Sequence, residues 1–481
     1  MSLAATGAQS PFELSARARE LLAQRVQKAV RAASGARAPA LAAVTVALPA
    51  ELDLSAAVLA ARRPDDRFFC FEQPERDGFV LAGLGSATAL EAGGPGRFSD
   101  VAARARDLGR RAFTDDAASD AARPAAAGPV FVGGFAFADD GGGTPEWASL
   151  APASLVLPEI SFARHRGEAR MTVSVVAHPD GTHALPATLA RTGELEPALM
   201  PLIDPDPVQR TRVASAAPPA HYEQAVERAV ERIRGGELQK VVLAREVRAH
   251  AAAPHDPAAV VGALRDAFPA CFCWCVGTPE LAFVGASPEL LVRRDGARAQ
   301  TVALAGTTRR SADPAVDDHL GEQLLRSLKD REEQTIVARR IERTLEPVSV
   351  WVTAADEPVL VKVQNVQHLA TPIRAQLADP LPAIELAGML LPTPAVGGEP
   401  REAALPLIPA LEGLDRGWYA GAVGWTDLGD DGEFCVALRC ALLRGRIAHL
   451  YAGCGIVRDS VPAEELAESE VKLEALLPLL S

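Results

Sequence analysis

The chain has 481 residues, of which 48% are apolar and 23% are charged, and its formal net charge is −13. These values are typical of a soluble globular protein with a large core. The acidic balance argues against nucleic acid or an anionic membrane as a partner, although it is compatible with a small anion held by local cations or by a metal. No targeting signal is recognisable, and the apolar segment 39–49 is too short to span a membrane, so we expect a cytoplasmic protein.

The first two hundred residues predict a β-rich portion with interspersed helices. The elements expected, in chain order, are a helix at 13–33 with Leu21, Leu22 and Val26 on its buried face, strands at 68–71 and 79–82, a turn at 83–88, a surface helix within 93–129, a strand at 129–137 and two strands within 155–176. We expect a mobile start over the first dozen residues and a linker at 201–219, which is rich in Pro, Asp, Ser and Ala.

The seven cysteines predict reduced thiols, because their number is odd and the chain lacks an export signal. Three of them alternate with aromatic residues in the segment 271–275, which as a strand would place the sulfur atoms on one face. Since no second Cys/His pair at zinc-type spacing accompanies them, we interpret these residues as small buried apolar side chains.

An amphipathic helix at 221–234, ended by Gly235 and Gly236, leads directly into a strand at 238–245 that carries Lys240 near its start. A lysine that enters an apolar strand can lose water, which favours its neutral form and allows it to act as a base. The alternative is a lysine at a strand end whose amine reaches solvent.

Two further positions suggest chemistry but have ordinary interpretations as well. Glu289 follows Pro288 after a strand and could act as a general acid if it is kept protonated, or it could begin a helix and bind backbone N–H groups. Gly306 would let the backbone approach a ligand closely, or it could be a simple turn glycine.

Acidic side chains recur on two predicted helices. A long helix expected at 317–345 carries Glu333, with leucines such as Leu328 on its buried side. In the last helix, Glu465, Glu468 and Lys472 share one face. Such carboxylates suit a hard divalent cation, but a solvated outer face with a Glu468–Lys472 pair would give the same pattern.

Taken together, these segments resemble the chorismate-utilising enzymes, which include isochorismate, anthranilate, aminodeoxychorismate and salicylate synthases. The resemblance is close from about residue 222 to 477 and looser before that. It rests on Lys240-Val-Val-Leu-Ala-Arg, Gly285-Ala-Ser-Pro-Glu289, Leu304-Ala-Gly-Thr307, Lys329-Asp-x-x-Glu333, His368-Leu-Ala-Thr371, Pro392-Thr-Pro-Ala395, Tyr419-Ala-Gly421, Arg439-Cys440, Ala452-Gly-Cys-Gly-Ile456 and Glu465-x-x-Glu468-x-x-x-Lys472.

The resemblance implies an α+β fold of two stacked, mainly antiparallel sheets flanked by helices. It also implies one large domain, 1–481, in which a β-rich portion, 1–200, joins a catalytic portion, 215–481. Mg²⁺ would be held by Glu333, Glu468 and Glu465, and it would lie over the ring carboxylate of chorismate. The residues expected to contact the substrate are Gly306 and Thr307, His368 at the ring, Ala395, and Tyr419, Arg439, Gly453 and Lys472 around the second carboxylate.

Two positions indicate which branch of the family the chain resembles. A lysine at position 240 is typical of members that add water, in which Lys240 would take a proton from water attacking C2 while Glu289 protonates the departing C4 hydroxyl. Ala395 stands where members that eliminate pyruvate tend to have threonine. Gln334 stands where many members have histidine, and we expect it to support the metal site rather than to bind the ion.

The resemblance therefore implies an isochorismate synthase, an isomerase that acts on chorismate, and we expect a monomer. A salicylate synthase and a homologue that binds chorismate without turning it over are the alternatives. Whether the isochorismate would serve menaquinone, a catechol siderophore or salicylate depends on neighbouring enzymes.

Overall fold

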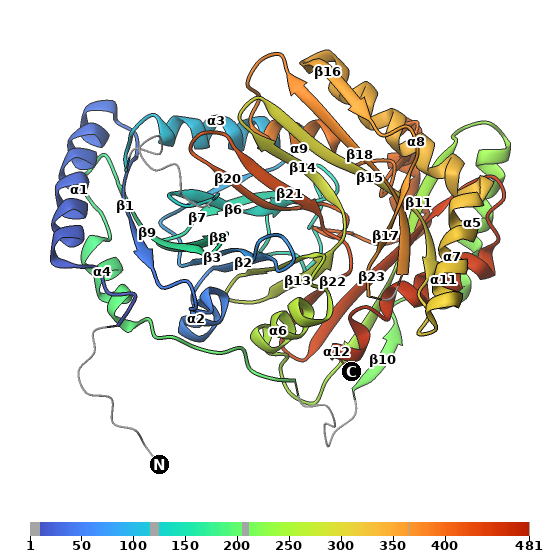
Figure 1. Cartoon of the computed structure of the whole chain (residues 1–481), viewed down its shortest axis with the longest axis horizontal. Coiled ribbons are helices and arrows are strands. Elements are labelled where there is room, and N and C mark those ends of the chain that lie inside the picture. The colour runs from blue at the N-terminus through green and yellow to red at the C-terminus, as the bar shows by residue number, and fades with distance from the viewer. Residues whose placement is uncertain (1–9, 116–124, 204–210, 365, 481) are drawn as a thin grey trace.

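The computed structural model describes residues 10–115, 125–203, 211–364 and 366–480, which fold into two large sheets and flanking helices (Figure 1). All strand pairs are antiparallel except the short β1–β5 pair. The predicted α+β fold with two stacked, mainly antiparallel sheets is therefore confirmed.

The first sheet contains strands from both halves of the chain. Its order is β10 (Arg212–Ser215), β11 (Lys240–His250), β23 (Ile447–Ile456), β22 (Cys440–Arg444), β13 (Ala282–Ser287), β12 (Phe272–Gly277), β2 (Phe68–Gln73), β3 (Phe79–Leu84), β8 (Ile160–His165), β9 (Glu168–Ala177), β1 (Ala40–Leu48) and β5 (Ala112–Phe113), with β19 (Gly398–Glu399) beside β11.

The second sheet also combines early and late strands. Its order is β16 (Ser349–Ala354), β18 (Val366–Leu377), β15 (Arg298–Arg309), β14 (Leu290–Asp295), β21 (Gly432–Val436), β20 (Ala422–Asp427), β6 (Val130–Phe135), β7 (Ala153–Leu157) and β4 (Thr88–Ala92), with β17 (Val359–Lys362) beside β18.

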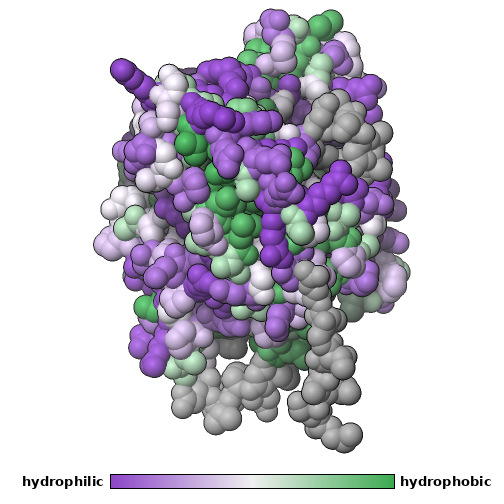
Figure 2. Space-filling view, turned by 90° about the vertical axis from the view of Figure 1, so that its left-hand side faces the viewer, coloured by the Kyte–Doolittle hydropathy of each residue, from purple (hydrophilic) through white to green (hydrophobic). Residues whose placement is uncertain are grey.

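Helices cover the outer sides and the ends of the two sheets (Figure 1). They are α1 (Ala16–Ala36), α2 (Leu54–Ala61), α3 (Arg97–Gly109), α4 (Leu185–Glu194), α5 (Pro219–Arg234), α6 (Pro257–Ala267), α7 (Pro314–Arg326), α8 (Leu328–Leu345), α9 (Ala383–Leu390), α10 (Arg401–Glu412), α11 (Pro462–Leu473) and α12 (Leu477–Leu480). Hydrophilic side chains predominate on the α1 side of the molecule, which Figure 2 shows. Within the described ranges, no helix is both long and apolar enough to cross a bilayer.

The first sheet is buried on both faces, and strand β12 shows how. Its aromatic residues Phe272 and Trp274 pack into the core between the two sheets. The cysteines Cys271, Cys273 and Cys275 point to the other face, where a second core lies under α1, α2 and α6. All seven cysteines are buried and unpaired, which confirms the prediction of reduced, buried thiols.

Most predicted elements are present in the N-terminal half, with two corrections. The first helix, the strands at 68–71 and 79–82, a turn at 85–87 within the predicted 83–88, helix α3 and strand β6 are confirmed, whereas Leu21 is 38% exposed and does not face the core. The segment 155–176 contributes to three strands rather than two, because Pro158 separates β7 from β8 and a tight turn at Arg166 and Gly167 separates β8 from β9.

Three expectations concern stretches that the structure describes only in part. Residues 1–9 of the predicted mobile start, 116–124 of the segment 93–129 and 204–210 of the predicted linker lie outside the described ranges. The described remainder of the linker is not all loop, because residues 212–215 form β10 against β11.

The predicted long helix at 317–345 is wrong, because the chain turns at Ser327 and forms two helices, α7 and α8. The Ser327 hydroxyl accepts a hydrogen bond from the backbone N–H of Asp330 at 3.3 Å and so begins a new helix. Leu328 is consequently 84% exposed instead of buried. The break places Lys329 and Glu333 in the first turns of α8, beside the site described below.

Candidate active site

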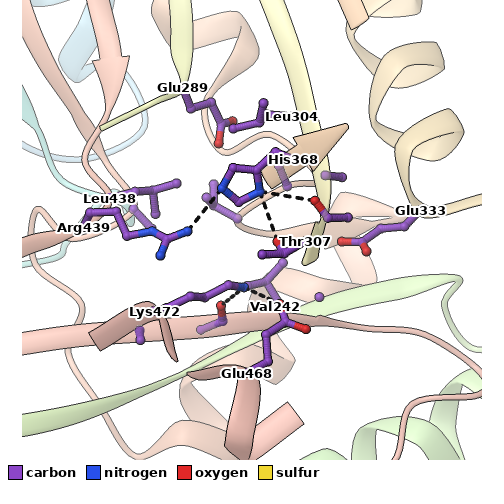
Figure 3. Close-up of a pocket in the computed structure, with 18 of the residues that line it drawn as sticks. Val242, Glu289, Leu304, Thr307, Glu333, His368, Leu438, Arg439, Glu468 and Lys472 are labelled. Carbon is purple, nitrogen blue, oxygen red and sulfur yellow. Dashed lines mark hydrogen bonds and ion pairs between the residues drawn. The ribbon is translucent and has the colours of Figure 1, made fainter. Parts of the chain in front are cut away.

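All predicted site residues except Lys240 line one pocket, which lies between β15, β18, β23, α8 and α11. The predicted residues on its wall are Glu289, Gly306, Thr307, Glu333, His368, Ala395, Tyr419, Arg439, Gly453, Glu465, Glu468 and Lys472. Figure 3 shows Glu289 at one end of the pocket and Lys472 with Glu468 at the other, while His368 lies between them.

Lys240 lies directly behind this wall. It is the first residue of β11, its side chain is fully buried, and its Nζ is 2.7 Å from Glu333 Oε1. The neighbouring Gly455 on β23 leaves room for this ion pair, because a methyl group there would collide with Glu333 Oε1 and lie 2.8 Å from Lys240 Cε. The alternative of a lysine that reaches solvent is therefore wrong.

Glu289 is a buried carboxyl group in the turn between β13 and β14. Burial raises its pKa to about 8, although the charge of Lys240 and the nearby Thr393 hydroxyl act in the opposite direction. Since Glu289 connects two strands, the alternative of a glutamate at the start of a helix is wrong. A carboxyl group with this pKa carries a proton at neutral pH and can donate it.

The acidic wall is formed by Glu333 on α8 and by Glu465 and Glu468 on α11. Burial, together with the charge of Glu468, raises the pKa of Glu465. Although burial of Glu468 acts in the opposite direction, Lys472, whose Nζ lies 2.7 Å from Glu468 Oε1, holds the pKa of Glu468 below its usual value. The predicted Glu468–Lys472 pair is present, but it faces the pocket and does not form a solvated outer face.

The donor atoms of this wall suit a hard divalent cation. One oxygen each from Glu465 and Glu468 and the sulfur of Cys454 lie within 4.8 Å of one another. Burial raises the pKa of the Cys454 thiol well above its usual value, so this residue is a thiol rather than a thiolate in the metal-free protein. The remaining donors of this cluster are the carboxylate oxygens of Glu465 and Glu468, a type of ligand that Mg²⁺ prefers. The third predicted ligand, Glu333, lies on the same pocket wall but is not part of this cluster.

A second group of side chains gives the middle of the pocket its polarity. Arg439 Nη2 lies 3.2 Å from His368 Nε2, while His368 Nδ1 lies 3.1 Å from Thr307 Oγ1 and 3.2 Å from the Gly306 carbonyl. Burial and the charge of Arg439 lower the pKa of His368 to about 3, so the ring is neutral. Because the guanidinium can only donate, Nε2 accepts and Nδ1 carries the hydrogen.

Gly306 is required by the backbone at this point. It lies in a bulge of β15 with φ of +72°, and a Cβ there would approach the Asp330 side chain to 3.0 Å. Opposite it, Lys472 Nζ donates a hydrogen bond to the Gly453 carbonyl at 2.8 Å. This part of the pocket therefore presents Arg439 and Lys472 beside main-chain polar groups.

Sequence reasoning missed a buried ion pair that holds two walls of the pocket together. Arg416 donates to the carbonyls of Val396 and Val242 at 2.8 and 2.9 Å, and its Nε lies 3.0 Å from Glu412 Oε2. Glu412 in turn accepts from the Ala244 N–H at 2.7 Å. The pair thus connects β11 to the loop that carries Ala395, but an Arg four residues after a Glu is too common a pattern to single out.

Lys329 also lines the pocket, and its Nζ lies 3.1 Å from Glu465 Oε1. It opens the motif Lys329-Asp-x-x-Glu333, in which only Glu333 was expected to have a role. Gln334 does not line the pocket. Its amide nitrogen instead donates to the Ala303 carbonyl and to Thr371 Oγ1, both at 2.9 Å.

Comparison with known proteins gives a consistent picture. A family model described as "Chorismate binding enzyme" matches residues 26–481. The salicylate biosynthesis isochorismate synthase of Pseudomonas aeruginosa is 38% identical over 415 residues, which cover 85% of this chain and 84% of that protein. Isochorismate synthase MenF of Bacillus subtilis is 34% identical over 361 residues, which cover 74% of this chain and 75% of that protein.

Solved structures agree with this result. The menaquinone-specific isochorismate synthase MenF of Escherichia coli superposes with a TM-score of 0.76 at 28% identity, covering 96% of this chain and all of that one. Anthranilate synthase component I of Streptococcus pneumoniae has a TM-score of 0.57 at 21% identity, covering 72% of this chain and 80% of that one, which shows a shared fold.

Proposed function

Because this chain belongs to the family of chorismate-binding enzymes, we propose that it is an isochorismate synthase, an isomerase that converts chorismate to isochorismate. The relatives that match most of its length are named as isochorismate synthases. The observation that carries the proposal is the buried Glu289, whose pKa of about 8 suits a general acid, in a pocket that also has an acidic wall.

In the proposed reaction, water attacks C2 of the ring and gives a proton to the side-chain amine of Lys240. The ring double bonds shift, the C4–O bond breaks, and Glu289 donates its proton to the departing hydroxyl, which leaves as water. One water is added and one is lost, so the product is an isomer of the substrate. Lys240 ends protonated and Glu289 ends ionised, and exchange with solvent restores both groups.

We propose Glu333, Glu465 and Glu468 as the residues that hold Mg²⁺. When bound, the ion would neutralise the carboxylate of the substrate ring and fix its position. Arg439 and Lys472 would bind the second carboxylate, and the neutral His368 ring would line the substrate ring, while Arg416 and Glu412 keep the strand of Lys240 in place behind it.

Ala395 supports a reaction that stops at isochorismate. It lies on the pocket wall between Pro394 and Val396, where its methyl group offers no hydroxyl to the substrate. We therefore favour isochorismate as the released product over salicylate, which requires loss of pyruvate after the same first step.

The test is to incubate purified protein with chorismate and Mg²⁺ and to separate the products by chromatography, with and without an added isochorismate pyruvate-lyase. Isochorismate alone, converted to salicylate only when the lyase is present, is the expected result. Salicylate without the lyase would identify a salicylate synthase, and no consumption of chorismate would indicate a non-catalytic homologue.

A further inference from the structure

Each of the three carboxylates on the acidic wall has its own lysine. Glu333 pairs with Lys240 at 2.7 Å, Glu465 pairs with Lys329 at 3.1 Å, and Glu468 pairs with Lys472 at 2.7 Å. The chain contains only five lysines among its 49 basic residues, and three of them are engaged here. Arginine serves almost everywhere else, so the compact ammonium group of lysine is concentrated at this wall.

The three lysines differ in how firmly the protein holds them. Lys240 is fully buried, and Lys472 donates a second hydrogen bond to the Gly453 carbonyl. Lys329 has a side chain that is 38% exposed, and in the described part of the chain its amine has no other hydrogen-bond or ion-pair partner than Glu465. Of the three lysines, Lys329 can therefore move away from its carboxylate most easily.

The position of Lys329 on its helix makes this contact depend on Glu465. Lys329 is the second residue of α8, where the positive end of the helix dipole disfavours a cation. Glu465, in contrast, is a buried carboxylate beside a second one, Glu468, and therefore requires a cation nearby. Either the ammonium of Lys329 or a divalent cation can satisfy this requirement.

We propose that Lys329 is a tethered counter-cation that occupies Glu465 when no divalent cation is bound, and that it swings toward solvent when the metal takes this carboxylate. This inference rests on the proposed function, since it assumes that Glu465 helps to bind Mg²⁺. The lysine neutralises a buried carboxylate in the metal-free protein. It also lowers the affinity for the metal, because the ion must displace the ammonium.

The test measures metal binding directly, without chorismate. Mn²⁺ is titrated into the full-length protein, and free Mn²⁺ is followed by its electron paramagnetic resonance signal. Lys329→Met keeps the length of the side chain and removes its charge, so we expect it to bind Mn²⁺ about three- to thirtyfold more tightly than the wild type. Lys329→Arg, whose guanidinium can hold Glu465 with two hydrogen bonds, should bind Mn²⁺ more weakly than the wild type.

Lys362→Met is the matched control, because Lys362 pairs with Asp317 and Asp318 at 3.0 and 2.8 Å and does not line the pocket. It should leave the affinity unchanged. Equal or weaker binding by Lys329→Met would overturn the proposal and make Lys329 a structural partner of Glu465. If neither the wild type nor Lys329→Met bound Mn²⁺, the metal ligands proposed above would be wrong as well. The product assay tests the proposed reaction independently of this result.

A second measurement uses only the wild-type protein and does not depend on the folding of a variant. In a crystal structure of the Mn²⁺-loaded protein, we expect Lys329 Nζ to lie beyond the 3.1 Å at which it contacts Glu465 Oε1 here, with no ion pair between them. An ion pair that persists beside the bound metal would overturn the proposal.

Discussion

Replacement of Glu289 by glutamine tests the proposed general acid most directly. Glutamine has nearly the shape of the protonated acid and places no charge in the buried turn, so the fold should survive. It cannot protonate the departing C4 hydroxyl. A positioned general acid typically contributes 10²- to 10⁴-fold to a rate, and we expect kcat to fall by about this factor while KM changes little.

The pKa of Glu289 gives a second prediction for the same residue. The wild type should follow a pH–rate profile for kcat/KM that declines above about pH 8, where the acid loses its proton. In Glu289→Gln the residual activity should lack this decline. The assay is the initial rate of isochorismate formation between pH 6 and pH 9.5, measured by chromatography at saturating and at low chorismate concentrations.

The stability of the same variant provides a control that does not depend on catalysis. Because the folded-state pKa of Glu289 lies above its unfolded value, the folded protein binds this proton more tightly. The stabilisation of the fold by this proton is fully present below the unfolded pKa of 4.5 and is lost as the pH rises to about 8. Between pH 5 and pH 9, the free energy of unfolding should therefore fall less in Glu289→Gln than in the wild type. Urea unfolding at these two pH values measures the difference.

One result would refute this reasoning. If Glu289→Gln kept more than a tenth of the wild-type kcat, Glu289 would not supply the proton, whatever its pKa. An unchanged decline above pH 8 in the variant would assign the titration to another group.

Three further predictions follow from the geometry of the site. Arg416→Met leaves Glu412 charged and buried without its partner, so the free energy of unfolding, measured in urea, should fall by about 3–5 kcal/mol, and a loss below 1 kcal/mol would mean that the pair is not needed. Gly455→Ala should lower kcat/KM at least tenfold, because the added methyl group displaces the Lys240–Glu333 pair, and wild-type kinetics would show that the pair moves freely. Removal of divalent ions with EDTA should abolish turnover and added Mg²⁺ should restore it, whereas full activity in EDTA would contradict the proposed metal wall.

Local patterns predicted much of the fold, and their failures have identifiable physical causes. Strand β12 was predictable because its aromatic residues and cysteines alternate, and the structure sends them into two different cores. The break at Ser327 was not, because the leucine spacing continues across it and a single hydroxyl decides where α8 begins. Likewise, nothing local indicates that β7 and β8 belong to different sheets.

In the site, too, some features were predictable from the sequence and others were not. The order of short motifs singled out the candidate residues, and the structure brings all of them except Lys240 to the wall of one pocket. Arg416 was not predictable, because its partners include the carbonyls of Val242 and Val396, which any residue provides. The pairs Lys240–Glu333 and Lys329–Glu465 were also hidden, since their members lie far apart in the sequence, whereas Glu468 and Lys472 are one helical turn apart and were expected as a pair.

The burial of all seven thiols has a practical consequence for handling the protein. Burial raises the pKa of every cysteine above its usual value, so the native protein presents hardly any thiolate to an alkylating or disulfide reagent. A thiol reagent can label these cysteines only after the sheets separate, so the rate of labelling reports the opening of the structure. Because the thiols lie in both cores, mass spectrometry of the labelled positions would show whether the two layers open together or one before the other.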